Sequence, residues 1–106
     1  MSKINFCRSI NINKINVNQI ESNREFLVEN EKYKTLFFKF EPTKGIPNHT
    51  HNGYASIQVL DGIVDMKFTD GEEFELNKGD FLPFDARKEH NVIARVTSKV
   101  LVTIIK

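Results

Sequence analysis

The sequence is poor in several residue types, and each shortage narrows what the protein is. Its 106 residues include no Trp and a single Cys, Cys7, so no disulfide can form within the chain. There is no apolar run long enough to cross a membrane and no charged, then apolar start of the kind that directs secretion. We therefore expect a protein of the reducing cytoplasm, in which Cys7 has a packing role and no chemical one.

An excess of charge of one sign is also lacking. Fifteen Lys and Arg residues stand against fourteen Asp and Glu residues, which gives a formal net charge of +1, and the two signs are interleaved along the chain. Nucleic acids and anionic membranes attract proteins through concentrated positive charge. We therefore predict no nucleic-acid partner and no membrane partner, which leaves a small molecule as the expected ligand.

Length and composition favour one all-β domain over residues 1–106. A chain of this size buries about two thirds of its unfolded surface and rarely divides into two cores. Hydrophobic residues make up 40% and charged residues 27%, near the average for globular domains. The nine Phe residues, together with many Val and Ile residues, favour strands over helices.

Turn signals follow one another closely after Phe26, with short β-rich stretches between them. Closely spaced strands joined by tight turns indicate a sandwich or a barrel. We predict one hairpin at Asp61-Gly62, between strands 54–60 and 63–68, and another at the following turn. The turn dipeptides are Lys44-Gly45, Asn52-Gly53, Asp61-Gly62, Asp70-Gly71 and Lys78-Gly79.

The two ends of the chain differ. Residues 100–105 hold enough β-branched residues for a final strand in the centre of a sheet. The Asn-rich stretch near the amino end fits an irregular edge strand better than a helix, because Asn competes for backbone hydrogen bonds. Its apolar positions, which are also candidates for a dimer interface, are Ile10, Ile12, Ile15, Val17 and Ile20.

Alternation of apolar and polar residues predicts which side chains face the interior. In strand 54–60, Ala55, Ile57 and Val59 share one face, and we expect the residues between them to face solvent or a partner chain. The other apolar positions in phase with such an interior face are Leu36, Phe38, Phe40, Val64, Met66, Phe68, Phe74 and Leu76.

The three histidines are the most informative residues. His49 and His51 stand two apart on a stretch predicted to be extended, so both can point to one side and bind the same ion. A third ligand must come from elsewhere, and the only other histidine, His90, opens a predicted strand. The alternative is that His49 and His51 are merely polar residues of a solvated turn.

The two stretches around these histidines resemble the two signature motifs of the cupin family, at about residues 45–62 and 79–94. The first motif has a glycine, a His-x-His and a second glycine; the second motif has a glycine, a proline and a histidine. The resemblance covers roughly residues 35–102 and implies a double-stranded antiparallel β-helix, or jelly-roll barrel. The residues at motif positions are Gly45, His49, His51, Gly62, Gly79, Pro83 and His90.

The sequence departs from the family pattern at one ligand position. The loops before His49 and before His90 also differ in length, which barrels tolerate. Counting back from Gly62 places Ala55 where the family carries an acidic or amide ligand, whereas Gln58 has the opposite parity and points outward. We therefore expect the fourth protein ligand to be missing.

The expected chemistry follows from this ligand set. Three neutral imidazoles suit a divalent transition metal (Fe, Zn, Ni, Mn or Cu) better than Mg²⁺ or Ca²⁺. Without a carboxylate ligand, the ion keeps its full charge and an open position for a small polar or anionic metabolite. The resemblance implies a dioxygenase, isomerase or lyase if the protein is an enzyme, and a homodimer. The alternative is a non-catalytic, metal-free module that binds a small ligand, and no catalytic residue is assigned.

Charged residues near the second motif have simpler explanations. Asp80 follows Gly79 and is expected to be a turn residue that accepts backbone hydrogen bonds. Arg87, Lys88 and Glu89 are expected to form a solvated loop, which at a barrel mouth can steer an anion.

Overall fold

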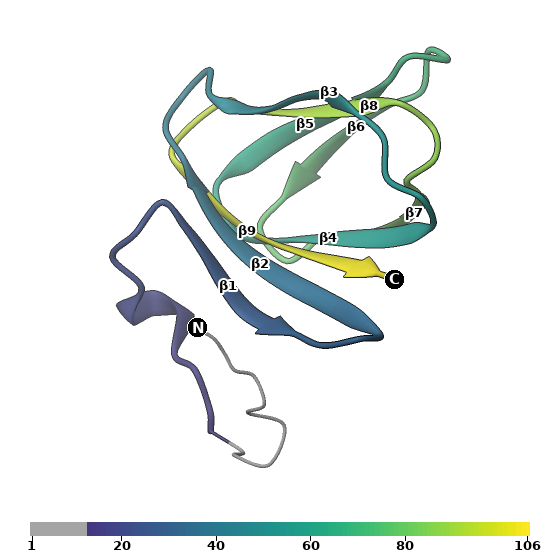
Figure 1. The fold of residues 1–106 in the computed structure, drawn as a ribbon. Coiled ribbons are helices and arrows are strands. Elements are labelled where there is room, and N and C mark those ends of the chain that lie inside the picture. Colours follow the sequence, from purple (N-terminus) through teal and green to yellow (C-terminus); the bar gives the residue numbers. More distant parts are fainter. Residues whose placement is uncertain (1–12) are drawn as a thin grey trace.

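The computed structural model describes residues 13–106 and places most of them in strands (Figure 1). Cys7, Ile10 and Ile12, for which packing or edge-strand roles are predicted, lie outside the described residues. A short 3₁₀ helix, η2 (Val17–Gln19), precedes the strands. The strands are β1 (Arg24–Glu29), β2 (Tyr33–Phe40), β3 (Gly45–His49), β4 (Tyr54–Asp61), β5 (Ile63–Phe68), β6 (Glu73–Asn77), β7 (Phe81–Asp85), β8 (His90–Ala94) and β9 (Ser98–Ile105).

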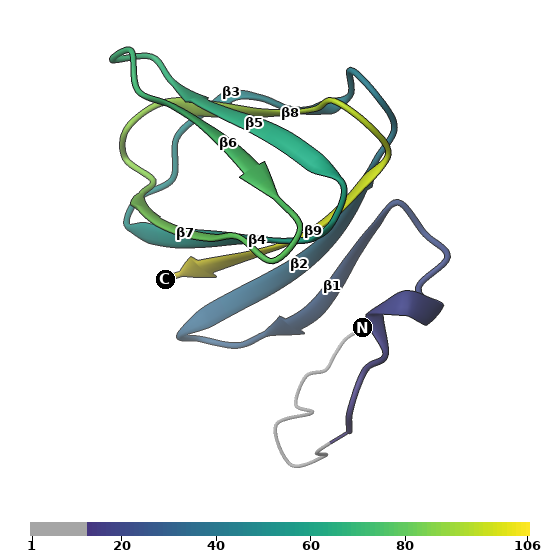
Figure 2. The ribbon, with the colours of Figure 1, turned by 180° about the vertical axis from the view of Figure 1, so that it is seen from behind.

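The strands form two sheets that face each other (Figure 1). One sheet has the order β1-β2-β9-β4-β7 and the other the order β3-β8-β5-β6, and every neighbouring pair is antiparallel. Viewed from behind, the edge strands β6 and β7 border the same side of the barrel (Figure 2). The predicted all-β jelly-roll barrel is confirmed.

The core lies between the sheets, on the faces that alternation predicts. Val59, Val64 and Met66 are fully buried, and Phe38 stacks on Phe40 with ring centroids 5.4 Å apart. Phe37, on the opposite face from Phe38, is also fully buried, so strand β2 is apolar on both faces. The buried core residues are Phe40, Ile57, Val59, Val64, Met66, Phe68, Leu76, Val92, Ala94 and Val100.

The predicted hairpin at Asp61-Gly62 is wrong. Strand β4 pairs with β7 and β9, whereas β5 pairs with β6 and β8, so the chain passes at Gly62 from one sheet to the other. Gly62 has φ 89°, and a Cβ there would lie 2.2 Å from Ser98 Oγ. The positive φ that suggested a hairpin instead permits a tight corner against Ser98.

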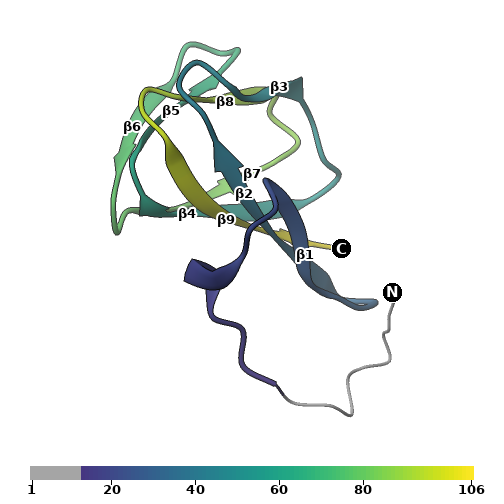
Figure 3. The ribbon, with the colours of Figure 1, turned by 90° about the vertical axis from the view of Figure 1, so that its left-hand side faces the viewer.

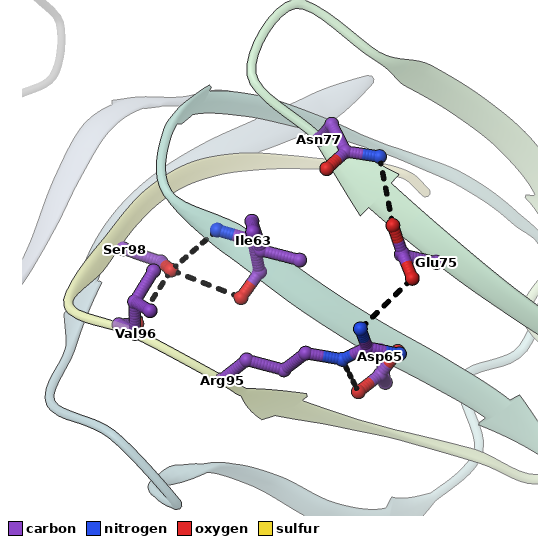
Figure 4. Close-up of polar contacts among 7 residues, drawn as sticks. All are labelled: Ile63, Asp65, Glu75, Asn77, Arg95, Val96 and Ser98. Atoms are coloured by element: carbon purple, nitrogen blue, oxygen red, sulfur yellow. Dashed lines mark hydrogen bonds and ion pairs between the residues drawn. The ribbon is translucent and has the colours of Figure 1, made fainter.

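Ser98 fastens this corner (Figure 4). Its hydroxyl is fully buried with the rest of the residue, and the Oγ accepts from the Ile63 N–H at 3.1 Å. The hydroxyl lies within donating distance of two carbonyls, those of Val96 at 2.7 Å and Ile63 at 3.2 Å. A buried hydroxyl needs such partners because the low dielectric makes an unpaired polar group costly.

The other predicted turns and ends have mixed outcomes. The hairpin at Asp70-Gly71 is confirmed, because it joins the paired strands β5 and β6. The final strand is confirmed as β9, in the centre of its sheet between β2 and β4. The predicted edge strand over Ile15 to Ile20 is wrong, since these residues contain η2 and the sheet edge is β1. The Asn16 side chain accepts from the Asn18 N–H at 3.0 Å, which favours a tight turn over a strand.

Residues 13–23, which include η2, lie outside the barrel (Figure 3). Within residues 13–106, no helix has the length and hydropathy needed to span a membrane.

On the outer face of the smaller sheet, Arg95 lies between two carboxylates (Figure 4). Asp65 and Glu75 are cross-strand partners on β5 and β6, so their like charges would repel. The Arg95 guanidinium contacts the Asp65 carboxylate at 2.7 Å and the Glu75 carboxylate at 2.9 Å. The ion pairs are exposed and contribute little each, but they remove this repulsion.

Candidate functional site

Two of the three histidines face each other across neighbouring strands. His49 at the end of β3 and His90 at the start of β8 are register partners, and their ring centroids lie 4.3 Å apart. The close pairing of β3 and β8 requires Gly45, where a Cβ would lie 1.8 Å from the Val92 carbonyl oxygen. The glycine that opens the first motif therefore lets the strand with His49 lie against the strand with His90.

Both imidazoles of this pair are held by backbone carbonyls. His49 Nδ1 lies 2.8 Å from the Pro47 oxygen, and His90 Nδ1 lies 2.6 Å from the Lys88 oxygen. A carbonyl only accepts, so each Nδ1 carries the hydrogen and donates it. In the neutral ring, Nε2 then keeps its lone pair, which is the arrangement of metal-binding histidines.

His51 is placed differently from the prediction. Strand β3 ends at His49, so the expectation that His49 and His51 share one extended strand is wrong. The His51 N–H donates to the Ala86 oxygen at 2.8 Å, in the loop that leads to His90. Its Nε2 is buried without a hydrogen-bond partner.

Within residues 13–106, no group of three or more His, Cys, Asp or Glu side chains is arranged to hold a metal ion. The structure thus brings together His49 and His90, and leaves His51 outside a complete three-histidine cluster. The Nε2 of His51 is nevertheless a nitrogen that can bind a metal ion or take part in a hydrogen bond. It is buried without a hydrogen-bond partner, and a buried polar atom without a partner costs free energy.

His90 lies in an apolar environment. Only 3% of the residue is exposed, and its ring contacts Phe84 at 4.9 Å and Phe68 at 5.7 Å between centroids. Burial lowers the pKa of His90 and the nearby His49 lowers it further, against the opposing effect of the hydrogen bond to Lys88. The ring is therefore biased toward the neutral form, the form that binds metals.

Ala55 points inward, as its parity predicts, and is 7% exposed. Its register partners are Phe84 on β7 and Ile104 on β9. A methyl group offers no donor atom, so this position supplies no metal ligand.

A cavity of about 250 Å³ lies beside His90, at the side of the barrel bordered by β6 and β7. Phe68 and Phe84, which contact the His90 ring, are also part of the cavity wall. The cavity residues are Phe68, Glu72, Phe74, Leu82, Pro83, Phe84, Asp85 and Lys88.

The residues near the second motif take the structural roles expected of them, with one addition. Asp80 is a turn residue, because its Oδ2 accepts from the Asn77 N–H at 2.7 Å. Arg87 and Lys88 are solvent-exposed, but each is also ion-paired: Arg87 with Asp85, and Lys88 with two carboxylates. No sequence pattern indicated the two pairs of Lys88, because its partners Asp70 and Glu72 come from the β5–β6 turn.

Sequence reasoning missed the groups that orient the histidines. Both are backbone carbonyls two residues before the ring they bind, at Pro47 and Lys88. It also missed the phenyl rings of Phe68 and Phe84 around His90. The only available signal was the apolar parity of Phe68, which predicted burial and not a contact.

Comparisons with known proteins agree with this fold. A family model described as Cupin domain matches residues 36–105. No curated protein matches the sequence. An RmlC-like cupin protein from Desulfovibrio desulfuricans is 26% identical, with a TM-score of 0.81 over 90% of this chain and 97% of that chain.

Two other solved structures are similar in fold. A conserved Streptococcus pyogenes protein of unknown function is 20% identical, with a TM-score of 0.77 over 91% of this chain and 89% of that one. KdgF from Halomonas sp. is 20% identical, with a TM-score of 0.69 over 77% of this chain and 76% of that one.

Proposed function

Because the chain belongs to the cupin family, we propose that it is a small barrel protein that binds one divalent transition metal ion through His49, His51 and His90. In this proposal the ion holds a small polar or anionic metabolite, which the protein binds or transforms. The observation that carries the proposal is the facing pair His49 and His90, whose Nδ1 atoms are both committed to carbonyls.

The donor atoms fit such an ion. Because the Nδ1 atoms of His49 and His90 bind carbonyls, the Nε2 lone pairs of both rings are free for an ion. The buried Nε2 of His51 has no hydrogen-bond partner. Nitrogen donors suit Fe, Zn, Ni, Mn or Cu, whereas Mg²⁺ and Ca²⁺ prefer oxygen. When bound, the ion supplies Lewis acidity and an open coordination position.

The residues of the chain set the conditions for this ion. Burial against Phe68 and Phe84 keeps His90 neutral, so it binds without first losing a proton. Ala55 adds no carboxylate, so three imidazoles leave the charge of a divalent ion uncompensated and favour an anionic ligand. If the protein is an enzyme, dioxygenase, isomerase and lyase chemistry are the classes we propose.

A non-catalytic module that binds a small ligand, with or without a metal ion, is the second candidate. It is favoured by the lack of a complete three-residue metal group within residues 13–106, and by the methyl group at Ala55. The two candidates differ in whether metal is needed for ligand binding.

Elemental analysis of protein purified without an affinity tag separates the candidates. We expect about one equivalent of a transition metal per chain, lost on replacing His49 and His90 together by Ala. Thr50→Ala is the matched control, because Thr50 is an exposed neighbour of His49 and the substitution leaves every imidazole in place. Wild-type protein that stays below a tenth of an equivalent after incubation with each of the five metals contradicts the metal-bound form.

The homodimer and the cytoplasmic location also remain proposals. The outer face of the five-stranded sheet exposes Tyr54, Phe81 and Ile105, at 60%, 60% and 47%, which supports an interface there. Light scattering that gives the mass of one chain contradicts the dimer.

The cytoplasmic location rests on the single Cys7.

A further inference from the structure

The cavity beside β6 and β7 has three phenyl walls and a charged rim. Phe68, Phe74 and Phe84 are arranged edge to face, with Phe68 centroids 6.1 Å from Phe74 and 5.9 Å from Phe84. Glu72, Asp85 and Lys88 complete the lining. Such a mixture of aromatic surface and a few charged groups is typical of small-ligand sites, and about 250 Å³ limits the ligand to a small molecule.

An ammonium group already occupies part of this site. Lys88 Nζ lies 5.0 Å from the centroid of the Phe68 ring, over its face. The same nitrogen contacts the Asp70 carboxylate at 2.7 Å and also the Glu72 carboxylate. A phenyl face and two carboxylates are the groups that recognise a cation, and here they recognise the side chain of Lys88.

The charge around the cavity disfavours an anion. Three carboxylates, Asp70, Glu72 and Asp85, face two cations, Lys88 and Arg87. Both cations are already paired, and the Arg87 guanidinium binds both oxygens of Asp85. An anionic ligand would add a fourth negative charge, whereas a ligand cation can replace the ammonium of Lys88.

We propose that this cavity binds a small organic cation, an ammonium group on an apolar or aromatic body, and that Lys88 Nζ holds the cation position in the free protein. The ligand body packs between Phe74 and Phe84, and its ammonium takes the place of Lys88 over Phe68 and beside Glu72. Lys88 is 42% exposed, so its side chain has room to move into solvent, where it loses its contacts with the two carboxylates and the Phe68 ring.

This site goes beyond the proposed metal function and does not depend on it. Phe68 and Phe84 form the wall between the cavity and His90, and none of the three histidines lines the cavity. Binding is therefore measured in EDTA, where failure of the metal proposal leaves the result unchanged.

Three probes that share a phenyl ring and differ in charge test the proposal: benzylamine is a cation, benzyl alcohol is neutral and benzoate is an anion. Each is titrated into the full chain while backbone amide NMR shifts are recorded. We expect benzylamine to bind most tightly and to shift the amides of Phe68, Phe74 and Phe84. Benzyl alcohol or benzoate binding as tightly as benzylamine overturns the proposed selectivity for a cation, and so do shifts confined to another part of the chain.

Substitution of Lys88 tests whether this residue competes with the ligand. Lys88→Met is expected to bind benzylamine about threefold to tenfold more tightly, the range given by exposed ion pairs and one cation–π contact. Lys78→Met, at the exposed β6–β7 turn, is the matched control and leaves the affinity unchanged. Equal affinities of Lys88→Met and Lys78→Met overturn the role of Lys88.

A second substitution tests the carboxylate without disturbing an ion pair. In the Lys88→Met background, adding Glu72→Gln is expected to weaken benzylamine about threefold or more and to leave benzyl alcohol unchanged. An equal loss for both probes shows that the change acts through cavity shape, and it overturns recognition of the ammonium by Glu72.

Discussion

His49 and His90 lie opposite each other on β3 and β8, and each donates its Nδ1 hydrogen to the carbonyl two residues earlier in the chain. The backbone therefore fixes the orientation of both rings before any ligand arrives. Pre-oriented rings lose little freedom on binding, and outer hydrogen bonds of this kind raise the affinity of a metal site. In both rings the Nδ1 hydrogen is thus committed to the backbone, and Nε2 is the nitrogen that remains for a ligand.

Metal affinity is expected to fall as the pH decreases below about 6.5, because each imidazole must be neutral to bind and free histidine titrates near that value. Isothermal titration calorimetry with Zn²⁺ between pH 7.5 and pH 5 measures the effect. An affinity that stays constant from pH 7 to pH 5 contradicts ligation by histidine.

The stability of the metal-free protein is also expected to depend on His90. Its pKa is lowered in the folded state by burial, so between the folded and unfolded pKa values the unfolded chain binds more protons. The folded state therefore has its full stability from the neutral His90 above about pH 6.5, and it loses this contribution as the pH falls toward the pKa of His90 in the folded state. Urea unfolding in EDTA is expected to show a smaller loss between pH 7 and pH 5 in His90→Gln than in the wild type. A wild-type protein that becomes more stable at pH 5 contradicts this sign.

Gly62 and Gly79 have nearly the same φ, 89° and 92°, but different surroundings. A Cβ at Gly79 meets nothing within 4 Å, whereas at Gly62 it would lie 2.6 Å from the Thr97 oxygen and 2.7 Å from Ser98 Cα. We expect Gly79→Ala to cost about 1–2 kcal/mol, from backbone conformation alone. Gly62→Ala adds overpacking against backbone and costs about 1–3 kcal/mol more.

Urea unfolding of the two alanine variants measures this difference in the free energy of unfolding. Because Gly79 controls for the positive φ, the difference isolates the close approach at Gly62. Equal losses in the two variants would show that the corner between the sheets relaxes without cost.

Arg87 is expected to control the titration of Asp85. Hydrogen bonds and charge from Arg87 lower the pKa of Asp85 from 3.8 to about 2. In Arg87→Gln, this pKa is expected to rise toward 3.8, measured by NMR of the side-chain carboxyl carbon. A carboxyl group whose pKa is lower in the folded state than in the unfolded state stabilises the fold at pH values above the unfolded pKa. This stabilisation is lost as the pH falls to about 2. The wild type is therefore expected to lose more stability than the variant between pH 5 and pH 2.

Arg95→Gln is the control for this titration, because Arg95 pairs with Asp65 on the other sheet. It is expected to leave the pKa of Asp85 near 2. A shift of Asp85 in both variants would show a general effect of net charge instead of the local ion pair.

The sequence predicted the features that depend on local pattern. Alternation placed Ile57, Val59 and Met66 inside and Ala55 at an inward position, because side chains of a strand point alternately to its two faces. The resemblance to the cupin motifs implied that His90 lies near the first histidine stretch, and His90 is the register partner of His49. The inward positions on a strand need no knowledge of which strands are neighbours.

The features that failed depend on long-range pairing. Asp61-Gly62 has hairpin chemistry, yet the following strand joins the other sheet, because Gly62 fits closely against Ser98 from far along the chain. His51 does not continue the strand of His49, and the N–H of His51 donates to the Ala86 oxygen in the loop before β8. Neither partner is indicated by local sequence.

The position of β9 has a consequence for how the chain reaches its native state. β9 lies between β2 and β4, and the hydroxyls of Thr35 and Thr103, 68 residues apart, meet at 2.9 Å across that pairing. The centre of the larger sheet thus forms only after a long loop closes, which costs entropy before any contact repays it. Refolding on the millisecond-to-second timescale of high-contact-order β proteins follows from this arrangement.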